Sequence, residues 1–291
     1  MTLGRVLITG GGGQLASDLA DLLDDAESRS REELDITDDA ALERAFEEVQ
    51  PEVVFNCAAF HNVGVCEREE DRSFEVNARA VKRIAELSAA RGARLVHFST
   101  NYVFDGASAE PYAEYDRPDP GSVYAISKLA GEYMALAYCP AALVVRSAGL
   151  YGVHGSASKG GNFVTRVVEG ARDRGDLRMV ADQRLNPTFT TDLAAAVVEA
   201  AKRRVTGILH LTSSDSCSWL EFSEAILELA GVDVPVEPVA TVRHPGDPAR
   251  PLNGVLARPA ADAAGLAPLR PWREALEDYM VRVGMAAARP A

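Results

Sequence analysis

Short apolar runs alternate with longer amphipathic segments along most of the chain. The short runs are rich in β-branched and aromatic residues, which is typical of buried strands, while the longer segments repeat their apolar residues at helical spacing. Strands that alternate with helices predict an α/β protein of the Rossmann type, in which helices cover both faces of a doubly wound parallel sheet. The expected strands are residues 5–9, 52–56, 95–100 and 143–146, and the expected helices are residues 17–23, 40–49, 74–91 and the segment that begins at Tyr124.

The alternation weakens beyond Gly152. Residues 154–161 are rich in glycine and serine, and residues 232–242 are extended and broken by proline. An apolar run near residues 207–212 is expected to return to the main sheet as a strand. We therefore expect a Rossmann domain over residues 1–152 and a smaller region over residues 153–291, with helices at residues 162–172, 192–203, 219–230 and 271–283.

A glycine turn joins the first strand to the first helix. Gly10 permits a tight turn, Gly13 lets the backbone approach a pyrophosphate, and the free amides at the helix start, from Gln14 and Leu15, face the anion. The spacing is Gly-x-x-Gly-x-x-Ala, which differs from the usual dinucleotide fingerprint, and many glycine clusters are plain turns. Its place between a strand and a helix favours a dinucleotide-binding site.

Tyr124 and Lys128 lie four residues apart, so on a helix they project from one face, one turn apart. A cation near a phenol stabilises the phenolate and lowers the tyrosine pKa from its ordinary value of about 10. The pair is therefore a candidate proton-transfer device. Two neighbours on an ordinary surface helix would have the same spacing.

Together these motifs resemble the extended short-chain dehydrogenase/reductase family and, within it, the dTDP-4-dehydrorhamnose reductases. The resemblance covers about residues 3–283. The segments that carry it are Ser99-Thr100-Asn101-Tyr102-Val103-Phe104-Asp105-Gly106, Asn56-Cys57-Ala58-Ala59, Leu34-Asp35-Ile36-Thr37-Asp38, Gly161-Asn162-Phe163, Asp182-Gln183 with Pro187-Thr188, and Pro271-Trp272-Arg273 with Leu276.

The resemblance implies reduction of a ketone by hydride transfer. Tyr124 would give a proton to the carbonyl oxygen, Thr100 would hold that oxygen, and Lys128 would lower the tyrosine pKa and bond the cofactor ribose. No metal is required. His97, on the same apolar strand as Thr100, is expected in the core or beside the cofactor.

The expected cofactor is NADPH, and NADH is the alternative. Arginine near the end of a second strand suits a 2′-phosphate, and Arg29 and Arg31 lie in the polar stretch 27–33; solvated surface arginines are an equal alternative. By resemblance, Asp35 and Ile36 lie beside the adenine. The small residues Ala58 and Ala59, together with Asn77, complete the expected cofactor contacts, although small residues also serve packing and Asn77 could serve local backbone.

The resemblance implies a dTDP-linked 4-keto-6-deoxy sugar as substrate. The candidates for substrate contact are Asn101, Tyr102, Gly149, Asn162, Phe163 and Arg184. Arg146, Arg166 and Arg184 are candidates for the diphosphate, and each could equally be a structural ion-pair residue. The chain departs from the family at Asn101, His61 and Gly64, at Gly149, where the family usually carries tryptophan, and at Leu185, where it usually carries glycine. These departures indicate either an altered sugar pocket or compensation between neighbours such as Leu185 and Gly149.

Functions other than reduction are possible on the same scaffold. A 4,6-dehydratase needs acid and base carboxylates after the threonine, whereas Asn101 and Tyr102 follow Thr100 here. An epimerase stays open. A non-catalytic subunit also stays open, because the resemblance extends to the regulatory subunit of methionine adenosyltransferase, although the complete Thr100, Tyr124 and Lys128 set favours catalysis.

Composition adds limits on partners and location. Forty-three acidic and thirty basic residues give a net charge of −13, which disfavours nucleic acid or an anionic membrane as partner. No apolar run reaches eighteen residues and no signal segment is visible, so we expect a cytoplasmic protein. The four dispersed cysteines fit reduced thiols better than disulfides or a zinc site. A homodimer is compatible with the sequence.

Overall fold

The computed structural model describes residues 3–154, 161–244 and 246–287. A six-stranded sheet forms its centre, in the order β10-β5-β4-β3-β1-β2, and every neighbouring pair is parallel. The Rossmann prediction is confirmed, and so is the return of the late strand, because β10 pairs with β5. The strands are β1 (Val6–Thr9), β2 (Ala26–Arg29), β3 (Val53–Asn56), β4 (Arg94–Thr100), β5 (Leu143–Ser147) and β10 (Gly207–His210).

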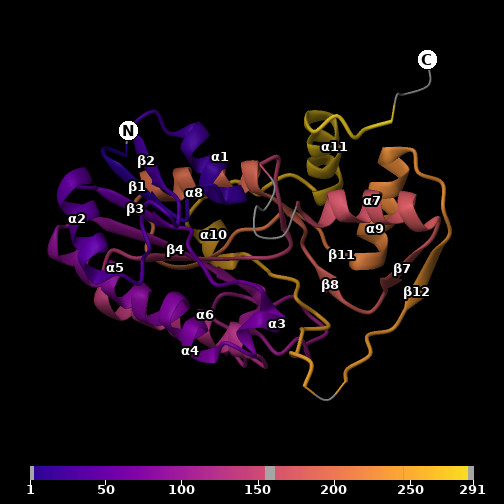
Figure 1. The fold of residues 1–291 in the computed structure, drawn as a ribbon, viewed down its shortest axis with the longest axis horizontal. Helices are drawn as coiled ribbons and strands as arrows, with labels where there is room; N and C mark the ends of the chain where they lie inside the picture. The colour runs from indigo at the N-terminus through magenta and orange to yellow at the C-terminus, as the bar shows by residue number, and fades with distance from the viewer. Residues whose placement is uncertain (1–2, 155–160, 245, 288–291) are drawn as a thin grey trace.

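Helices cover both faces of this sheet, as Figure 1 shows. Successive residues of a strand point to opposite faces, so Ile8 packs with one helix layer and Leu7 with the other. With both faces buried, the strands read as continuous apolar runs, which is why the sequence located them. One layer holds α1 (Gln14–Leu22), α8 (Thr190–Lys202) and α10 (Pro259–Ala263), and the other holds α2 (Asp39–Val49), α5 (Ala80–Ala90) and α6 (Val123–Tyr138).

The segment predicted as a helix over residues 74–91 is helical, but it begins earlier, at Glu70, and its second turn is not a regular α-helix. The chain there forms α4 (Glu70–Phe74), a π-helical turn η1 (Glu75–Arg79), and then α5. The turn carries Asn77, whose Oδ1 accepts from the Phe60 amide and whose Nδ2 donates to the Phe60 carbonyl, both at 2.9 Å. Single π-helical turns of this kind recur at functional sites. Two other short elements border the sheet edge, α3 (Val63–Cys66) and the 3₁₀ turn η2 (Asn101–Val103).

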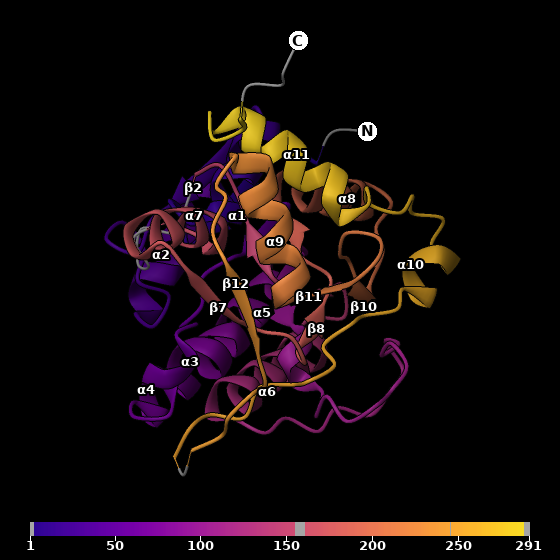
Figure 2. The same ribbon diagram turned by 90° about the vertical axis from the view of Figure 1, so that its right-hand side faces the viewer.

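A second hydrophobic cluster lies beside the sheet and is visible on the right of Figure 1 and facing the viewer in Figure 2. Two of its helices begin at strong N-caps, because Asn162 and Ser218 each form a capping box. The Gly/Ser-rich connection expected over residues 154–161 falls largely outside the described residues. The elements are α7 (Phe163–Arg174), α9 (Trp219–Ala230), α11 (Trp272–Arg282), the parallel pair β7 (Leu177–Val180) and β12 (Val236–Val239), and the short strands β6 (Leu150–Tyr151), β8 (Arg184–Leu185), β9 (Thr188–Phe189) and β11 (Cys217–Ser218).

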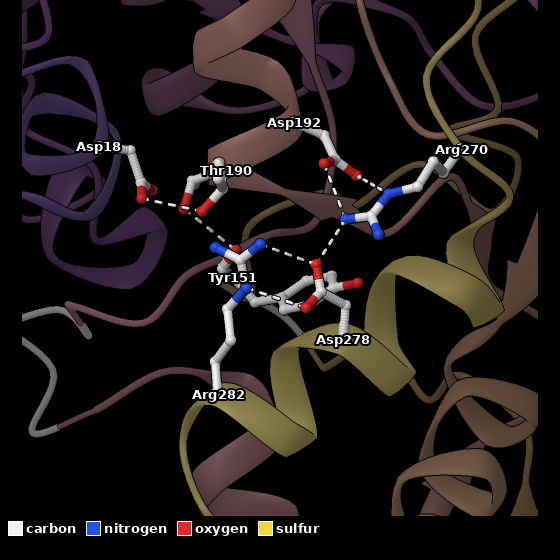
Figure 3. A network of polar contacts seen from close by, with 8 residues as sticks. Asp18, Tyr151, Thr190, Asp192, Arg270, Asp278 and Arg282 are labelled. Atoms are coloured by element: carbon white, nitrogen blue, oxygen red, sulfur yellow. Dashed lines mark hydrogen bonds and ion pairs between the residues drawn. The ribbon is translucent and has the colours of Figure 1, made fainter. Parts of the chain in front are cut away.

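An ion network joins this cluster to the sheet layer (Figure 3). Arg270 lies 2.8 Å from Asp192 at the start of α8 and 3.0 Å from Asp278 on α11, and Arg282 lies 2.9 Å from the same Asp278. These contacts hold α11 against the beginning of α8. None of the described helices is long and apolar enough to span a bilayer.

Candidate active site

The three expected catalytic residues meet at the carboxyl edge of the sheet, where the parallel strands end. Thr100 is the last residue of β4, and α6 carries Tyr124 and Lys128 one turn apart. Ser122 caps α6 by accepting from the Ala125 amide at 3.3 Å, which fixes where the helix begins. The Thr100 side chain is hydrogen-bonded to Tyr124, and the ring of Tyr102 meets the Tyr124 ring edge-on at 5.8 Å.

The expected effect of Lys128 on the tyrosine is not present in this structure. Burial raises the pKa of Tyr124, and the hydrogen bond from Thr100 acts in the opposite direction. Burial lowers the pKa of Lys128 to about 8, against the attraction of the Glu132 carboxylate. The Lys128 ammonium donates to the Phe98 carbonyl at 2.6 Å, so it is held by the strand and not by the phenol.

A chain of buried polar groups leads from Lys128 across the sheet. The Nε2 of His97 lies 3.5 Å from the Lys128 Nζ, and its Nδ1 lies 3.2 Å from the Asn56 amide nitrogen. The Asn56 Oδ1 accepts from the Thr9 hydroxyl at 2.7 Å. His97 is in the core and next to the expected cofactor edge, as the sequence indicated. Asn56 and Thr9 were missed, although a polar residue that ends each of two adjacent buried strands was an available signal.

The glycine turn packs closely against the neighbouring strand ends before the start of α1. Gly10 has φ +74°, and a Cβ there would lie 2.7 Å from the Ala58 amide nitrogen, so only glycine fits. Gly11, which the sequence reasoning passed over, is equally restricted, because its Cβ would lie 2.8 Å from the carbonyl carbon of Arg29. Gly13 caps α1 without a side chain, and the Oε1 of Gln14 is buried with no hydrogen-bond partner among the described residues. These features suit a dinucleotide pyrophosphate.

The two candidate arginines near the end of β2 differ in their surroundings. Arg29 lies 2.8 Å from Glu48, whereas the Arg31 side chain is 67% exposed and lies 3.8 Å from Asp35. The Asp35 carboxylate accepts from the backbone and hydroxyl of Thr37, which lowers the pKa of Asp35. Arg31 is therefore the cation left available at this edge.

Several other expected cofactor contacts are buried groups. Leu15 and Ile36 pack in the two helix layers. The Asn77 side chain also donates to the Ser127 hydroxyl at 3.0 Å, so it ties the loop after β3 to α6. That loop contains Ala58 and Ala59, which are half-buried beside the glycine turn.

The residues expected to contact the substrate mainly make contacts within the protein. The Asn101 amide donates to the Gly254 carbonyl at 2.9 Å. Asn162 caps α7 and donates to the Tyr279 hydroxyl at 2.8 Å, and the Phe163 ring lies 4.3 Å from that of Trp219. Tyr102 alone among these four has its ring against that of Tyr124.

The arginines proposed for the diphosphate have different surroundings. Arg146 is in a buried ion pair with Glu132 at 2.6 Å, with both side chains at most 2% exposed, so the structural alternative holds for Arg146. Arg184 lies 3.3 Å from Glu221 and lines a hollow of about 440 Å³ that none of Thr100, Tyr124 and Lys128 borders. Arg166 is exposed on α7.

Gly149 and Leu185 lie against each other. Gly149 has φ +56°, and a Cβ on it would lie 2.6 Å from the Cδ1 of Leu185. The leucine therefore fills the space that a side chain at position 149 would take, and whether this exchange alters the sugar pocket stays a prediction. His61 and Gly64 follow β3, with Gly64 inside α3, where a Cβ would make an ordinary contact with the Asn62 Oδ1 at 3.9 Å.

Comparison with known proteins identifies the family. The RmlD substrate binding domain matches residues 4–285. The chain is 38% identical to a dTDP-4-dehydrorhamnose reductase of Mycobacterium tuberculosis, over 94% of this chain and 91% of that one, and 36% identical to a dTDP-4-keto-6-deoxy-D-glucose reductase of Streptomyces niveus, over 94% and 95%. A crystal structure of the dTDP-4-dehydrorhamnose reductase of Bacillus anthracis in complex with NADP superposes with a TM-score of 0.91 at 32% identity, covering 97% of this chain and all of that one. The chain belongs to the RmlD family of dTDP-4-dehydrorhamnose reductases, within the extended short-chain dehydrogenase/reductases.

Proposed function

We propose that this protein reduces the 4-keto group of a dTDP-linked 6-deoxy sugar, with NADPH as the reductant. The observation that carries the proposal is the meeting of Thr100, Tyr124 and Lys128 at the sheet edge where the glycine turn opens. Ligands of open α/β sheets bind at that edge. The relatives' names agree with this substrate class, and one of their structures contains NADP.

The cofactor and three residues would each have a separate role in the reduction. When bound, the reduced nicotinamide supplies the hydride. Tyr124 donates its hydroxyl proton to the carbonyl oxygen of the sugar, and the Thr100 hydroxyl donates a hydrogen bond to the same oxygen. Lys128, whose ammonium contacts the Phe98 carbonyl in this structure, would stabilise the phenolate that remains once its positive charge faces that oxygen. Each contact strengthens as negative charge develops on the carbonyl oxygen. Each therefore stabilises the transition state more than the bound substrate and lowers the activation barrier.

The cofactor preference would rest on Arg31. Its guanidinium is exposed at the end of β2, next to the glycine turn, where a 2′-phosphate would lie. Gly10, Gly13 and Gln14 would hold the pyrophosphate, and Lys128 would bond the ribose. NADH would bind less tightly, because it offers Arg31 no phosphate.

We assign cofactor binding to residues 1–152, joined by α8 and β10, and substrate binding mainly to the cluster of α7, α9 and α11. The protein would act in the cytoplasm on a small-molecule substrate, with neither nucleic acid nor a membrane as partner. A homodimer is compatible with this role.

Oxidation of NADPH with a panel of dTDP-4-keto sugars, with product stereochemistry read by NMR, tests the function. Turnover of at least one 4-keto-6-deoxy sugar is expected. Interconversion of hydroxyl epimers without net NADPH oxidation would identify an epimerase. Cofactor binding without turnover of any keto sugar would favour a regulatory subunit.

A further inference from the structure

The substrate diphosphate needs a cation that no carboxylate has already engaged. The chain carries a net charge of −13, so a dianionic ligand is not attracted by the molecule as a whole. Arg146 is buried against Glu132, and Arg184 is paired with Glu221. Arg166 lies on α7, which packs against α9 and β7 in the second cluster. None of the three is a free cation beside Tyr124.

The segment 246–253 returns from the second cluster to the sheet edge. A Cβ on Gly121 would lie 2.9 Å from the Cβ of Ala249, so Ala249 packs directly before the Ser122 cap of α6. Pro251 packs on Gly106, where a Cβ would lie 2.4 Å from the Pro251 Cα.

Two backbone hydrogen bonds fix the end of the same segment. The Asn253 amide donates to the Gly106 carbonyl at 3.1 Å, and the Arg184 amide donates to the Leu252 carbonyl at 2.7 Å. Arg250 stands between Ala249 and Pro251. It is therefore held between the start of the helix that carries Tyr124 and the loop that follows Thr100.

The Arg250 guanidinium is exposed and takes part in no ion pair or hydrogen bond with the residues that the structure describes. Its charge lowers the pKa of Tyr102, against the larger effect of burial, which raises it. The Tyr102 ring in turn meets the ring of Tyr124 at 5.8 Å. Arg243 donates to the Arg250 carbonyl at 3.3 Å and brings a second positive charge to the same segment.

We propose that Arg250 binds the diphosphate of the nucleotide-sugar substrate, an assignment that rests on the proposed function. The 4-keto carbon and the anomeric oxygen lie at opposite ends of one pyranose ring, so the diphosphate must lie within about one ring of the proton donor. A guanidinium presents a planar fork of donors that matches two phosphate oxygens. Arg250 would thus hold the nucleotide end of the substrate, one sugar ring away from the carbonyl that Tyr124 protonates.

Arg250→Gln removes the charge and keeps much of the side-chain length. The dissociation constant of dTDP, measured by calorimetry with NADP⁺ bound, and the KM of the keto sugar are expected to rise roughly 10-fold or more, the scale of a lost charge-assisted contact. The kcat and the affinity for NADPH should change little. Arg44→Gln is the matched control, because Arg44 is exposed on α2 and has no ion pair among the described residues. Arg250→Lys should lie between the wild type and Arg250→Gln, because it keeps the charge but loses the fork.

Three results would overturn the assignment. Equal dTDP affinity in Arg250→Gln and wild type, with both still reducing a keto sugar, would refute the inference and leave the proposed function standing. An equal loss of NADPH and dTDP affinity would make Arg250 a cofactor residue. A wild-type protein that neither binds dTDP nor oxidises NADPH with any keto sugar would remove the proposed function, and the inference with it.

Discussion

The Lys128 ammonium lies 3.5 Å from the Nε2 of His97, in a place where both groups are almost fully buried. Burial lowers the pKa of both side chains, and the positive charge of Lys128 lowers that of His97 further. His97 is therefore neutral beside the lysine at neutral pH. The proposed catalytic role of Lys128 explains why a charge is kept in the core at this point, at a cost to the stability of the cofactor-free protein.

Lys128→Met should stabilise the cofactor-free protein at pH 7 while it abolishes reduction. The pKa of Lys128 is about 8 in the fold, below its ordinary value of 10.5 in the unfolded chain. The cost of burying the charge is therefore complete below pH 8, and it disappears as the pH rises from about 8 to 10.5. We expect the melting temperature to rise by about 2 °C or more at pH 7, with a smaller gain at pH 9.5. A lower melting temperature at pH 7 would show that the contact with the Phe98 carbonyl outweighs desolvation.

Tyr124→Phe removes the proton donor and keeps the ring. We expect kcat to fall ~100-fold or more, the scale of lost general acid catalysis, with little change in NADPH affinity. Tyr133→Phe is the control, because Tyr133 is on the same helix but 59% exposed. Steady-state kinetics of both variants measure the difference. An active Tyr124→Phe enzyme would mean that another group supplies the proton.

Arg31→Ala should separate the two cofactors. Losing one exposed phosphate contact is expected to weaken NADPH binding about 10-fold and leave NADH binding nearly unchanged. Titration against intrinsic fluorescence measures both affinities, with Arg79→Ala, another exposed arginine paired to a carboxylate, as the control. If both cofactors weaken equally, Arg31 does not read the 2′-phosphate.

The buried pair of Arg146 and Glu132 should dominate stability behind the active site. Arg146→Met leaves the Glu132 carboxylate buried without its partner, which is expected to cost about 3–5 kcal/mol in the free energy of unfolding. The double variant Arg146→Met with Glu132→Leu should recover most of that loss. Urea unfolding measures all three proteins. A single variant as stable as the double would mean that water or Ser99, which donates to Glu132, satisfies the carboxylate.

The sequence predicted what depends on strong local patterns. The buried strands gave continuous apolar runs, and the helix over residues 219–230 matches α9, because Ser218 and Gly231 mark its two ends. The π-helical turn at Asn77 has no such pattern, because its cause is the distant backbone of Phe60.

The partners of the charged residues also have no local pattern in the sequence. Nothing near Arg146 in the sequence indicates a partner fourteen residues away on a helix, and only the packing of β5 against α6 brings Glu132 to it. The contact of Lys128 with the Phe98 carbonyl likewise depends on how α6 lies on β4. The sequence shows which residues carry a charge, whereas the partner of each charge is known only from the three-dimensional structure.

Gly149→Trp tests whether the exchange at Gly149 and Leu185 sets the shape of the sugar pocket. In the single variant the indole meets the Cδ1 of Leu185, 2.6 Å from the position of the new Cβ, and the φ of +56° disfavours any side chain. We expect the single variant to lose about 1–3 kcal/mol of stability. Gly149→Trp with Leu185→Gly removes the clash, so part of the loss should return, and the interaction energy of the two changes should exceed about 0.5 kcal/mol.

The same double variant reports on specificity. If the leucine only replaces the lost indole wall, kcat/KM across the panel of keto sugars should keep its order. If the exchange reshapes the pocket, the order should shift towards dTDP-4-dehydrorhamnose. The double variant carries the family's usual residues at positions 149 and 185, so its pocket should resemble that of the family. Leu185→Gly alone is the control, because it opens the cavity without adding the ring. We expect the shift in substrate order in the double variant and not in Leu185→Gly alone. An unchanged order in both variants would mean that residues other than Gly149 and Leu185 select the sugar.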